Sequence, residues 1–367
     1  MPQPDRSAPP SLRLGLVGAG GIGEVHADAA RRAGWSLEVV CDADRSRAEA
    51  LAERHGGRVV ADLDALLDEE GVDAVAIATP NATHRPLAEA ALAAGRHVLL
   101  EKPAGMNAAE CDRLAEAEAS SGRILQIGLV CRHTPVAAEV ARIVESGRLG
   151  TVYQARANLH RRRGIPGLGG WFTDKSMSGG GPLIDLGVHV IDLVLHVLAQ
   201  PRVLRASGVT YATFGRDIGS YVHQEMWGGP PRPGGVFDVE DHASALLRLE
   251  GGATFEMNVA WAANLVDGAV RDGIVLLGDR AGLFFEPLGN SVRIATEEDG
   301  RLLDVQPVLE TEDGGQAAWR RQYETFAAAI RGEGPRVAPV GECRRTQAAI
   351  DAIYRSAEAG CEVEVDA

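Results

Sequence analysis

A glycine motif directly after an apolar run is the feature that most constrains the fold of this chain. The run from Leu12 to Val17 is compact and β-prone, and the letters GAGGIG follow it at positions 18–23. In such a motif the first glycine permits a tight turn, the second lets a ligand approach the backbone, and the third lets the following helix pack closely on the strand. The motif therefore predicts a strand, a sharp turn and a helix that begins near Ile22.

The same alternation continues to about residue 129. Short apolar runs recur at 37–41, 58–60, 74–78, 97–100 and 124–127, and helical patterns fill 22–33, 44–55, 63–68, 82–94 and 108–121. Alternating strands and helices are typical of βαβ units, whose strands form a parallel sheet. We therefore expect an α/β fold with an N-terminal Rossmann-type, doubly wound domain over residues 12–130. The proline-rich residues 1–11 are expected to be a disordered lead-in.

After Leu129 the pattern changes. A helix is predicted over 135–146, and alternating polar and apolar runs follow at 152–159, 244–249, 253–261 and 273–277, with a further candidate strand inside 201–237. Period-two alternation predicts a large, open, mainly antiparallel sheet in a second α/β domain, residues 131–367. The Gly/Pro-rich insertion at 214–237 favours an excursion or a lid-like loop. Two late helices, 316–331 and 341–359, are free to pack back on the first domain.

Composition excludes several classes of partner. A formal net charge of −14 opposes general attraction to nucleic acid, and no apolar run approaches the roughly 18 to 20 residues of a membrane span. Five scattered cysteines without a C-x-x-C spacing favour reduced thiols in the cytoplasm. The run Arg161–Arg163 is the local exception, and a solvated strand end is a better interpretation of it than a phosphate site.

The glycine motif together with Asp42 indicates a dinucleotide cofactor. Backbone N–H groups at the start of a helix bind a pyrophosphate, and a carboxylate about twenty residues further on accepts hydrogen bonds from the adenosine ribose. The same carboxylate repels a ribose 2′-phosphate, so NAD is favoured over NADP. Arg45 and Arg47 keep NADP open, because either could compensate a phosphate. Asp42 could alternatively be only a surface turn residue.

Two further strand ends face the same edge of the predicted sheet. The fourth strand leads into Thr79-Pro80-Asn81-Ala82-Thr83-His84, where Asn81 either caps the next helix or contacts the nicotinamide side of the cofactor. The fifth strand ends in Glu101-Lys102-Pro103, where a proline aims the lysine from a rigid turn. The predicted cofactor-binding residues are Gly18, Gly20, Gly21, Ile22, Gly23, Asp42, Arg45, Thr79, Pro80, Asn81, His84, Glu101 and Lys102.

A glycine-rich run, GGGPLIDLGVHVID at 179–192, predicts a helix that carries Asp185 and His189 on one face. Hydride transfer needs a base for the hydroxyl proton and a cation near the oxygen, and His189 with Lys102 suits these tasks. His189 could instead be a packing histidine. A metal site that includes His196 is not favoured, and no metal is predicted, because zinc sites show a tighter ligand set. The predicted catalytic residues are Lys102, Asp185 and His189.

Taken in order, GAGGIG, Asp42, TPNATH, EKP and GGG-x-x-x-D-x-G-x-H-x-x-D resemble the glucose-fructose oxidoreductase, inositol dehydrogenase and rhizopine-catabolism family (Gfo/Idh/MocA). The resemblance extends from Leu12 to about Ala359. It implies a homodimer or homotetramer through the second sheet, and a catalytic set that matches Lys102, Asp185 and His189. Gly128, Arg132 and Pro135 also resemble the family's G-x-x-x-R-x-x-P passage between the domains.

The function that the resemblance implies is transfer of a hydride between NAD and a secondary hydroxyl or carbonyl of a sugar, a cyclitol or a similar polyol. Two alternatives stay open: a redox-neutral NAD-dependent lyase or glycosidase on the same fold, and a non-catalytic dinucleotide-binding regulator. The predicted substrate-binding residues are Lys102, His160, Arg163, Trp171, Asp185 and His189, with Asp174, Asp192 and His242 as weaker candidates.

Overall fold

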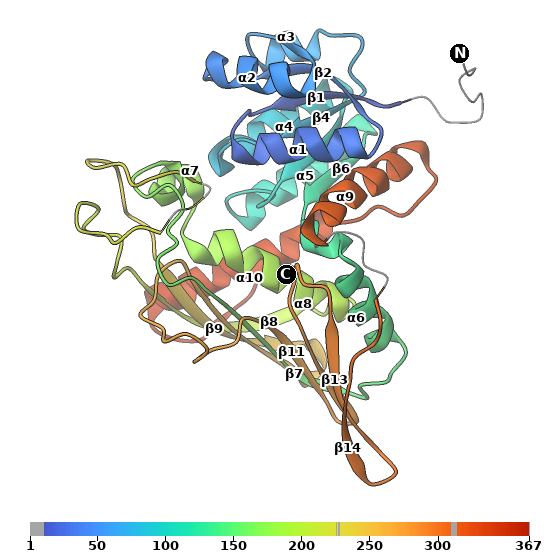
Figure 1. Ribbon diagram of the computed structural model, residues 1–367, viewed down its shortest axis with the longest axis vertical. Helices are drawn as coiled ribbons and strands as arrows, with labels where there is room; N and C mark the ends of the chain where they lie inside the picture. The colour runs from blue at the N-terminus through green and yellow to red at the C-terminus, as the bar shows by residue number, and fades with distance from the viewer. Residues whose placement is uncertain (1–10, 225, 227, 310–313, 367) are drawn as a thin grey trace.

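The computed structural model describes residues 11–224, 226, 228–309 and 314–366, which form two α/β units stacked along the long axis of the molecule (Figure 1). The upper unit contains the glycine motif. The lower unit is built on a broad open sheet. Of the predicted lead-in 1–11 only Ser11 lies within the described residues, and its hydroxyl donates a hydrogen bond to the carbonyl of Gly34.

The first unit is the predicted Rossmann domain. Its described strands form a six-stranded parallel sheet of order β3-β2-β1-β4-β5-β6. The strands are β1 Arg13–Val17, β2 Ser36–Cys41, β3 Arg58–Val59, β4 Ala74–Ile77, β5 His97–Glu101 and β6 Leu125–Gly128. The helices are α1 Gly21–Arg32, α2 Arg45–His55, α3 Leu63–Leu67, α4 His84–Ala93 and α5 Ala108–Ser121. All six predicted strands and all five predicted helices are confirmed, to within a few residues at their ends.

Burial on both faces explains why these strands have continuous apolar sequences. Every residue of β4 is buried, and β5 is buried after its first residue. Residues of α1 and α2 pack on one face of the sheet, and residues of α3, α4 and α5 pack on the other. The reversal of strand order between β1 and β4 leaves a crevice at the carboxyl edge, which is where ligands of such folds bind.

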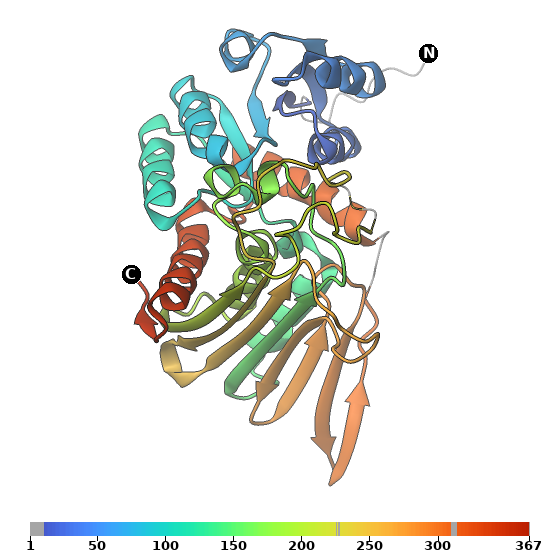
Figure 2. The same cartoon turned by 90° about the vertical axis from the view of Figure 1, so that its left-hand side faces the viewer.

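The second unit has a nine-stranded, mainly antiparallel sheet among its described residues, ordered β14-β13-β12-β11-β7-β10-β9-β8-β15, with β7 and β10 parallel (Figure 2). Its predicted strands are β7 Val152–His160, β8 Val203–Tyr211, β9 His242–Leu249, β10 Thr254–Ala260 and β11 Gly273–Gly278. The strands that the sequence analysis missed are β12 Ala281–Phe285, β13 Val292–Glu298, β14 Arg301–Val305 and β15 Val363–Glu364. The open antiparallel sheet is therefore confirmed, and it is larger than predicted.

Helices cover one face of this sheet. They are α6 Pro135–Glu145, α8 Val188–Val197 and α10 Val340–Ala359, whereas the short α7 Lys175–Ser178 lies against the first unit near Asn81. Buried side chains of β7, β9, β10 and β11 pack against α6, α8 and α10 in one continuous core that also reaches the parallel sheet. That continuity joins the two units.

The last long helices do pack back on the first domain. In α9, Gly314–Arg331, Tyr323 and Phe326 are buried in the core between α1 and the parallel sheet, and Trp35 stacks on Phe326. Helix α10 contacts α5 and β8, so it spans the junction of the units. The boundary at residue 130 therefore marks a change of sheet, although helices from the second unit complete the first.

Residues 175–197 are long and apolar enough to cross a membrane by length and composition, with a mean hydropathy of 1.4. However, 89% of that window is buried inside the protein. The segment is thus apolar on all sides because it forms the centre of the core, as expected for a buried helix.

Candidate active site

A cleft of about 1520 Å³ lies between the carboxyl edge of the parallel sheet and the second unit. The glycine motif, Asp42 and the ends of β4 and β5 line it from the first unit. The second unit contributes the start of the catalytic helix, the residues after β7, and the loops after β10 and β12. The described structure therefore brings most of the predicted site residues to one cavity.

The glycine turn has the features that a dinucleotide requires. A Cβ atom on Gly18 would come within 2.4 Å of the Ala78 carbonyl oxygen, and one on Gly23 within 2.1 Å of the Gly18 carbonyl oxygen. Those two glycines are required by packing. No protein atom lies within 4 Å of the Cβ position of Gly20, so the protein itself leaves open the space where the backbone would meet a pyrophosphate. Gly18, Gly20, Gly21 and Ile22 line the cleft, and Gly23 does not.

Asp42 lines the cleft beyond that turn and also holds it in place. Its Oδ2 accepts a hydrogen bond from the Ala19 N–H at 2.6 Å, and its Oδ1 accepts one from the Asp44 N–H at 2.7 Å. Each oxygen retains a further lone pair for a ribose hydroxyl. Arg45, another predicted cofactor residue, lies outside the lining residues and pairs with Glu49.

Thr79, Pro80 and Asn81 line the cleft, whereas His84 does not. Asn81 does not cap a helix, since its side-chain N–H donates to the Ser178 carbonyl at 2.7 Å and so ties the two units together. His84, which was predicted to bind the cofactor, holds backbone segments together in this structure. It is buried, with its ring nitrogens 2.8 Å from the Pro103 carbonyl oxygen and 2.9 Å from that of Thr79, so it joins the loops after β4 and β5.

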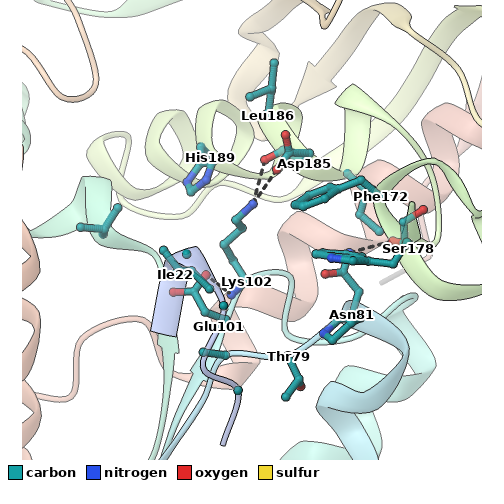
Figure 3. A pocket seen from close by; sticks show the side chains of 18 of the residues that line it. Ile22, Thr79, Asn81, Glu101, Lys102, Phe172, Ser178, Asp185, Leu186 and His189 are labelled. Carbon is teal, nitrogen blue, oxygen red and sulfur yellow. Dashed lines mark hydrogen bonds and ion pairs between the residues drawn. The ribbon is translucent and has the colours of Figure 1, made fainter. Parts of the chain in front are cut away.

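Lys102 and Asp185 form a close ion pair at the centre of the cleft (Figure 3). Lys102 Nζ lies 2.7 Å from Asp185 Oδ1, and the two side chains are 17% and 7% exposed. The second carboxylate oxygen accepts a hydrogen bond from the Trp261 indole N–H at 2.9 Å. His189 comes from the first turn of α8, and its ring lies beside the Lys102 side chain in Figure 3.

The Asp185 carboxylate bonds the lysine rather than His189, the residue with which it was predicted to share one face of a helix. Residues Leu183–Gly187 form a π-helical turn before α8, so the spacing of four does not give ideal α-helical geometry. Within the described residues the Asp185 side chain bonds Lys102 and Trp261. The polar contact of the His189 ring is to Cys131 Sγ, at 4.0 Å from Nδ1.

The charges around Asp185 and His189 set their protonation. Burial would raise the pKa of Asp185, but the charges of Lys102 and Arg161 and the hydrogen bonds from Lys102 and Trp261 outweigh it and lower that pKa to about 2. Burial, assisted by the positive charge of Lys102, lowers the pKa of His189 to about 4. Near pH 7 the site therefore holds a carboxylate and a neutral imidazole, the form of histidine that accepts a proton.

Glu101 lies behind Lys102 and is part of a buried hydrogen-bonded chain. His26 Nε2 is 3.0 Å from Glu101 Oε1, and His26 Nδ1 is 2.9 Å from the Tyr323 hydroxyl. Gly128 has room only for hydrogen, since a Cβ there would lie 2.7 Å from Glu101 Oε1. Glu101 also lines the cleft, and the chain fixes the strand end that presents the lysine.

Two of the predicted substrate residues lie outside the lining of the cleft. Leu159 and Arg161 line it, whereas His160 between them does not, and its Nδ1 lies 3.2 Å from Oδ1 of Asp272, which is itself a lining residue. Arg163 also lies outside the cleft lining, and its guanidinium donates to Asn264 Oδ1 at 2.6 Å. Trp171 lines the cleft as predicted.

The weaker candidates have structural positions outside the cleft lining. The Asp174 side chain caps α7, and His242 lies on β9 beside the His160 ring. Asp192 is buried in a bidentate pair with Arg132, the arginine of the G-x-x-x-R-x-x-P passage. No group of three His, Cys, Asp or Glu side chains within the described residues is arranged to hold a metal ion.

Sequence reasoning missed several lining residues, among them Arg161, Phe172, Met177, Gly180 and Trp319. An aromatic pair, Trp171 and Phe172, was the available signal for the wall that they form. The insertion at 214–237 contributes no described residue to the lining of the cleft. It supports that wall instead: the Arg232 N–H donates to the Leu168 carbonyl, and Thr173 Oγ1 donates to the Val236 carbonyl.

Comparison with known proteins places the chain in a family. A family model described as an oxidoreductase family with an NAD-binding Rossmann fold matches residues 12–129, and the C-terminal domain model of the same GFO/IDH/MocA family matches residues 137–283. The D-glucoside 3-dehydrogenase of Escherichia coli K12 is 29% identical over 359 residues, which cover 96% of this chain and 97% of that protein.

Two other proteins are similar over the whole chain or a large part of it. Inositol 2-dehydrogenase 2 of Saccharopolyspora erythraea is 34% identical over 253 residues, 68% of this chain and 66% of that protein. The structure of a levoglucosan dehydrogenase in complex with NADH and levoglucosan has the same fold, with a TM-score of 0.85 at 21% identity, and the match covers 98% of this chain and 100% of that one. The chain is therefore a member of the GFO/IDH/MocA oxidoreductases, the family with an NAD-binding Rossmann fold.

Proposed function

We propose that the protein is an NAD-dependent dehydrogenase that transfers a hydride between nicotinamide and a secondary hydroxyl or carbonyl of a sugar, an inositol or a related polyol. The observation that carries the proposal is the convergence of Lys102, Asp185 and His189, from distant parts of the chain, in the cleft that also contains the glycine turn. The D-glucoside and inositol dehydrogenases among its relatives support this substrate class.

Residues of the first unit would hold the cofactor. Gly18, Gly20 and Gly21 would meet the pyrophosphate, and Asp42 the adenosine ribose. When bound, NAD supplies the hydride acceptor for the carbon that bears the hydroxyl. Asp42 makes this site unfavourable for a 2′-phosphate, which is why we propose NAD rather than NADP.

His189 of the second unit would accept the proton of the substrate hydroxyl, and Lys102 would bind its oxygen. His189 is uncharged near pH 7 and can accept the hydroxyl proton of the substrate. The Lys102 ammonium, fixed by Asp185, can donate a hydrogen bond to the same oxygen and stabilise the negative charge that develops there. The Trp261 indole N–H binds the other oxygen of Asp185 and so fixes the carboxylate, which in turn orients the Lys102 ammonium.

Two single substitutions test the assignment. Lys102→Met and His189→Asn should each lower kcat about 10²- to 10⁴-fold, the usual contribution of a positioned acid, base or charge. NADH binding, followed by cofactor fluorescence, should change by less than about threefold. NADH formation is measured with wild-type enzyme on a panel of sugars, inositols, anhydrosugars and sugar acids. Near-normal turnover in either variant would remove our assignment.

The same assay separates the alternatives. A redox-neutral lyase or glycosidase would convert its substrate without net NADH formation, and a regulator would bind NADH without turnover. The relatives named as dehydrogenases favour net oxidation.

We also propose that the protein is cytoplasmic and forms a homodimer or homotetramer through the uncovered face of the nine-stranded sheet. Tyr211 and Val209 of β8 are 50% and 46% exposed on that face. Light scattering after size-exclusion chromatography measures the assembly, and a monomer at micromolar concentration would contradict it.

A further inference from the structure

Arg161 follows β7 directly and lies in the wall of the cleft, next to the proposed reacting groups. Its N–H donates to the Ala260 carbonyl at 2.9 Å, which continues the pairing of β7 with β10 beyond His160. Leu159 and Arg161 line the cleft and His160 between them does not, as expected for side chains that alternate along an extended strand. The backbone therefore fixes the direction in which this arginine leaves the sheet.

The arginine side chain rests on a residue that leaves room for it. A Cβ on Gly164 would lie 2.7 Å from Arg161 Cδ and 2.9 Å from its Cβ. The guanidinium Nη1 donates to the Gly164 carbonyl oxygen at 3.3 Å, which is a long hydrogen bond. Gly164 thus makes room for the Arg161 side chain, and most of the guanidinium N–H groups are left to bind a ligand.

Within the described part of the chain, Arg161 has no carboxylate within ion-pair distance. Arg132 pairs with Asp192 and Glu342, and Arg85 with Glu89 and Glu110. Arg96 and Arg163, which lack a carboxylate partner among the described residues, use their donors on several carbonyl or amide oxygens instead. A guanidinium has five N–H donors, and a half-buried one without an anionic partner is a poor arrangement unless a ligand supplies the acceptor.

Most of the other charged groups at this end of the cleft have a partner nearby. Lys102 and Asp185 compensate each other, and His189 is neutral near pH 7. On the outer wall, Asp272 pairs with His160, and Glu286 lies 3.9 Å from Arg271. Among the described residues Arg161 has no carboxylate partner of its own, and it lies close enough to Asp185 for its positive charge to lower the pKa of that carboxylate.

We propose that Arg161 determines specificity by binding a carboxylate of the substrate, so that the preferred substrates are sugar acids. This proposal rests on the proposed dehydrogenase function and refines its substrate class. The planar fork of the guanidinium matches a carboxylate with two parallel hydrogen bonds. A carboxylate carries one negative charge, whereas a phosphomonoester carries close to two and would lie near the Asp185 carboxylate, whose ionisation Arg161 influences, so the carboxylate is the better match.

The test compares compounds that differ in one substituent: methyl β-D-glucuronide, methyl β-D-glucoside and glucose 6-phosphate. Binding to the NADH-loaded protein, which cannot oxidise a polyol, is measured by calorimetry, and kcat/KM is measured separately with NAD. We expect the glucuronide to bind at least about tenfold more tightly than the glucoside, as for a charge-assisted bidentate pair. Arg161→Gln should reduce that preference to within about twofold, with little change for the glucoside.

Arg162→Gln is the matched control. It removes the same charge from the next residue in the chain, whose side chain is exposed. It should keep the preference of the wild type. The inference is overturned if the glucoside binds as well as the glucuronide, if glucose 6-phosphate binds better than the glucuronide, if none of the three binds, or if both variants behave alike. If the glucuronide binds more tightly than the glucoside in an Arg161-dependent way but no NADH forms, the proposed dehydrogenase function is contradicted. The carboxylate-binding role of Arg161 is then still supported.

Discussion

At each end of the cleft a single carboxylate fixes the positions of the neighbouring groups. Asp185 accepts hydrogen bonds from Lys102 and Trp261, and its low pKa keeps it ionised over the whole physiological range. Asp42 at the other end binds two backbone N–H groups and still faces the cavity. In each case a carboxylate fixes its neighbours and keeps lone pairs for a ligand.

Asp42 gives the first prediction at this scale. Asp42→Ala should weaken NAD binding about tenfold or more and NADP binding far less, because NADP gains relief from repulsion as it loses the ribose contact. The two dissociation constants are measured with the reduced cofactors by fluorescence. Asp42→Asn removes the charge but keeps one acceptor oxygen, which can still bond the Ala19 N–H of the glycine turn, so it helps to separate charge from loop structure. Equal losses for both cofactors would remove the basis for preferring NAD.

His133 gives a prediction about acid stability. Burial, with the positive charge of Arg132, lowers the pKa of His133 to about 3, whereas an unfolded histidine titrates near 6.5. As pH falls below about 6.5, the unfolded chain takes up a proton that the folded protein cannot, so the free energy of unfolding decreases by up to about 1.4 kcal/mol per pH unit until about pH 3.

The variant His133→Leu lacks this titration. Between pH 7 and pH 5 its free energy of unfolding should fall by about 2 kcal/mol less than that of the wild type. Urea unfolding at both pH values measures the difference, and other histidines cancel because both proteins contain them. Parallel pH dependences would show that His133 takes up its proton in the folded state.

At the scale of elements, the position of the catalytic helix depends on a buried ionic cluster. Arg132, from the turn after β6, makes two hydrogen bonds to Asp192 of α8, and its other end contacts Glu342 of α10. The Arg132 and Asp192 side chains are each 1% exposed. The cluster therefore joins the end of the parallel sheet to the helix that carries His189.

Breaking one half of this cluster should cost more than removing both halves. Arg132→Met leaves Asp192 buried without a partner and should destabilise the protein by about 3–5 kcal/mol, whereas Arg132→Met with Asp192→Leu should restore a good part of the loss. Chemical denaturation of the wild type, both single variants and the double variant gives the coupling energy. A double variant as unstable as the sum of the singles would show that the ion pair is not coupled.

The elements also show where sequence patterns stop being sufficient. Strands buried on both faces, such as β4 and β5, have continuous apolar runs and were predicted closely. Strands β13 and β14 are mostly exposed towards their ends, so their apolar signal is weak, and they form by pairing with β12 and with each other. Pairing with a neighbour, which local periodicity does not reveal, decided their existence.

At the scale of the whole molecule, one continuous hydrophobic core joins the two units that form the walls of the cleft. Buried residues of β4 and β5 belong to the same continuous cluster as those of α8, α10 and β10. Helix α9 returns to the first unit, where Tyr323 completes the hydrogen-bonded chain to Glu101. The catalytic lysine is therefore positioned by residues from the beginning, middle and end of the chain.

The sequence alone determined the parallel sheet, the glycine turn, and the candidates Lys102, Asp185 and His189, because strand burial and turn chemistry are local and leave a local pattern. Only the tertiary structure decided that Asp185 pairs with Lys102, that His84 is buried between loops, and that Arg161 rather than His160 or Arg163 faces the cleft. The reason is physical: the direction and partners of a side chain depend on strand register and on packing against segments distant in sequence.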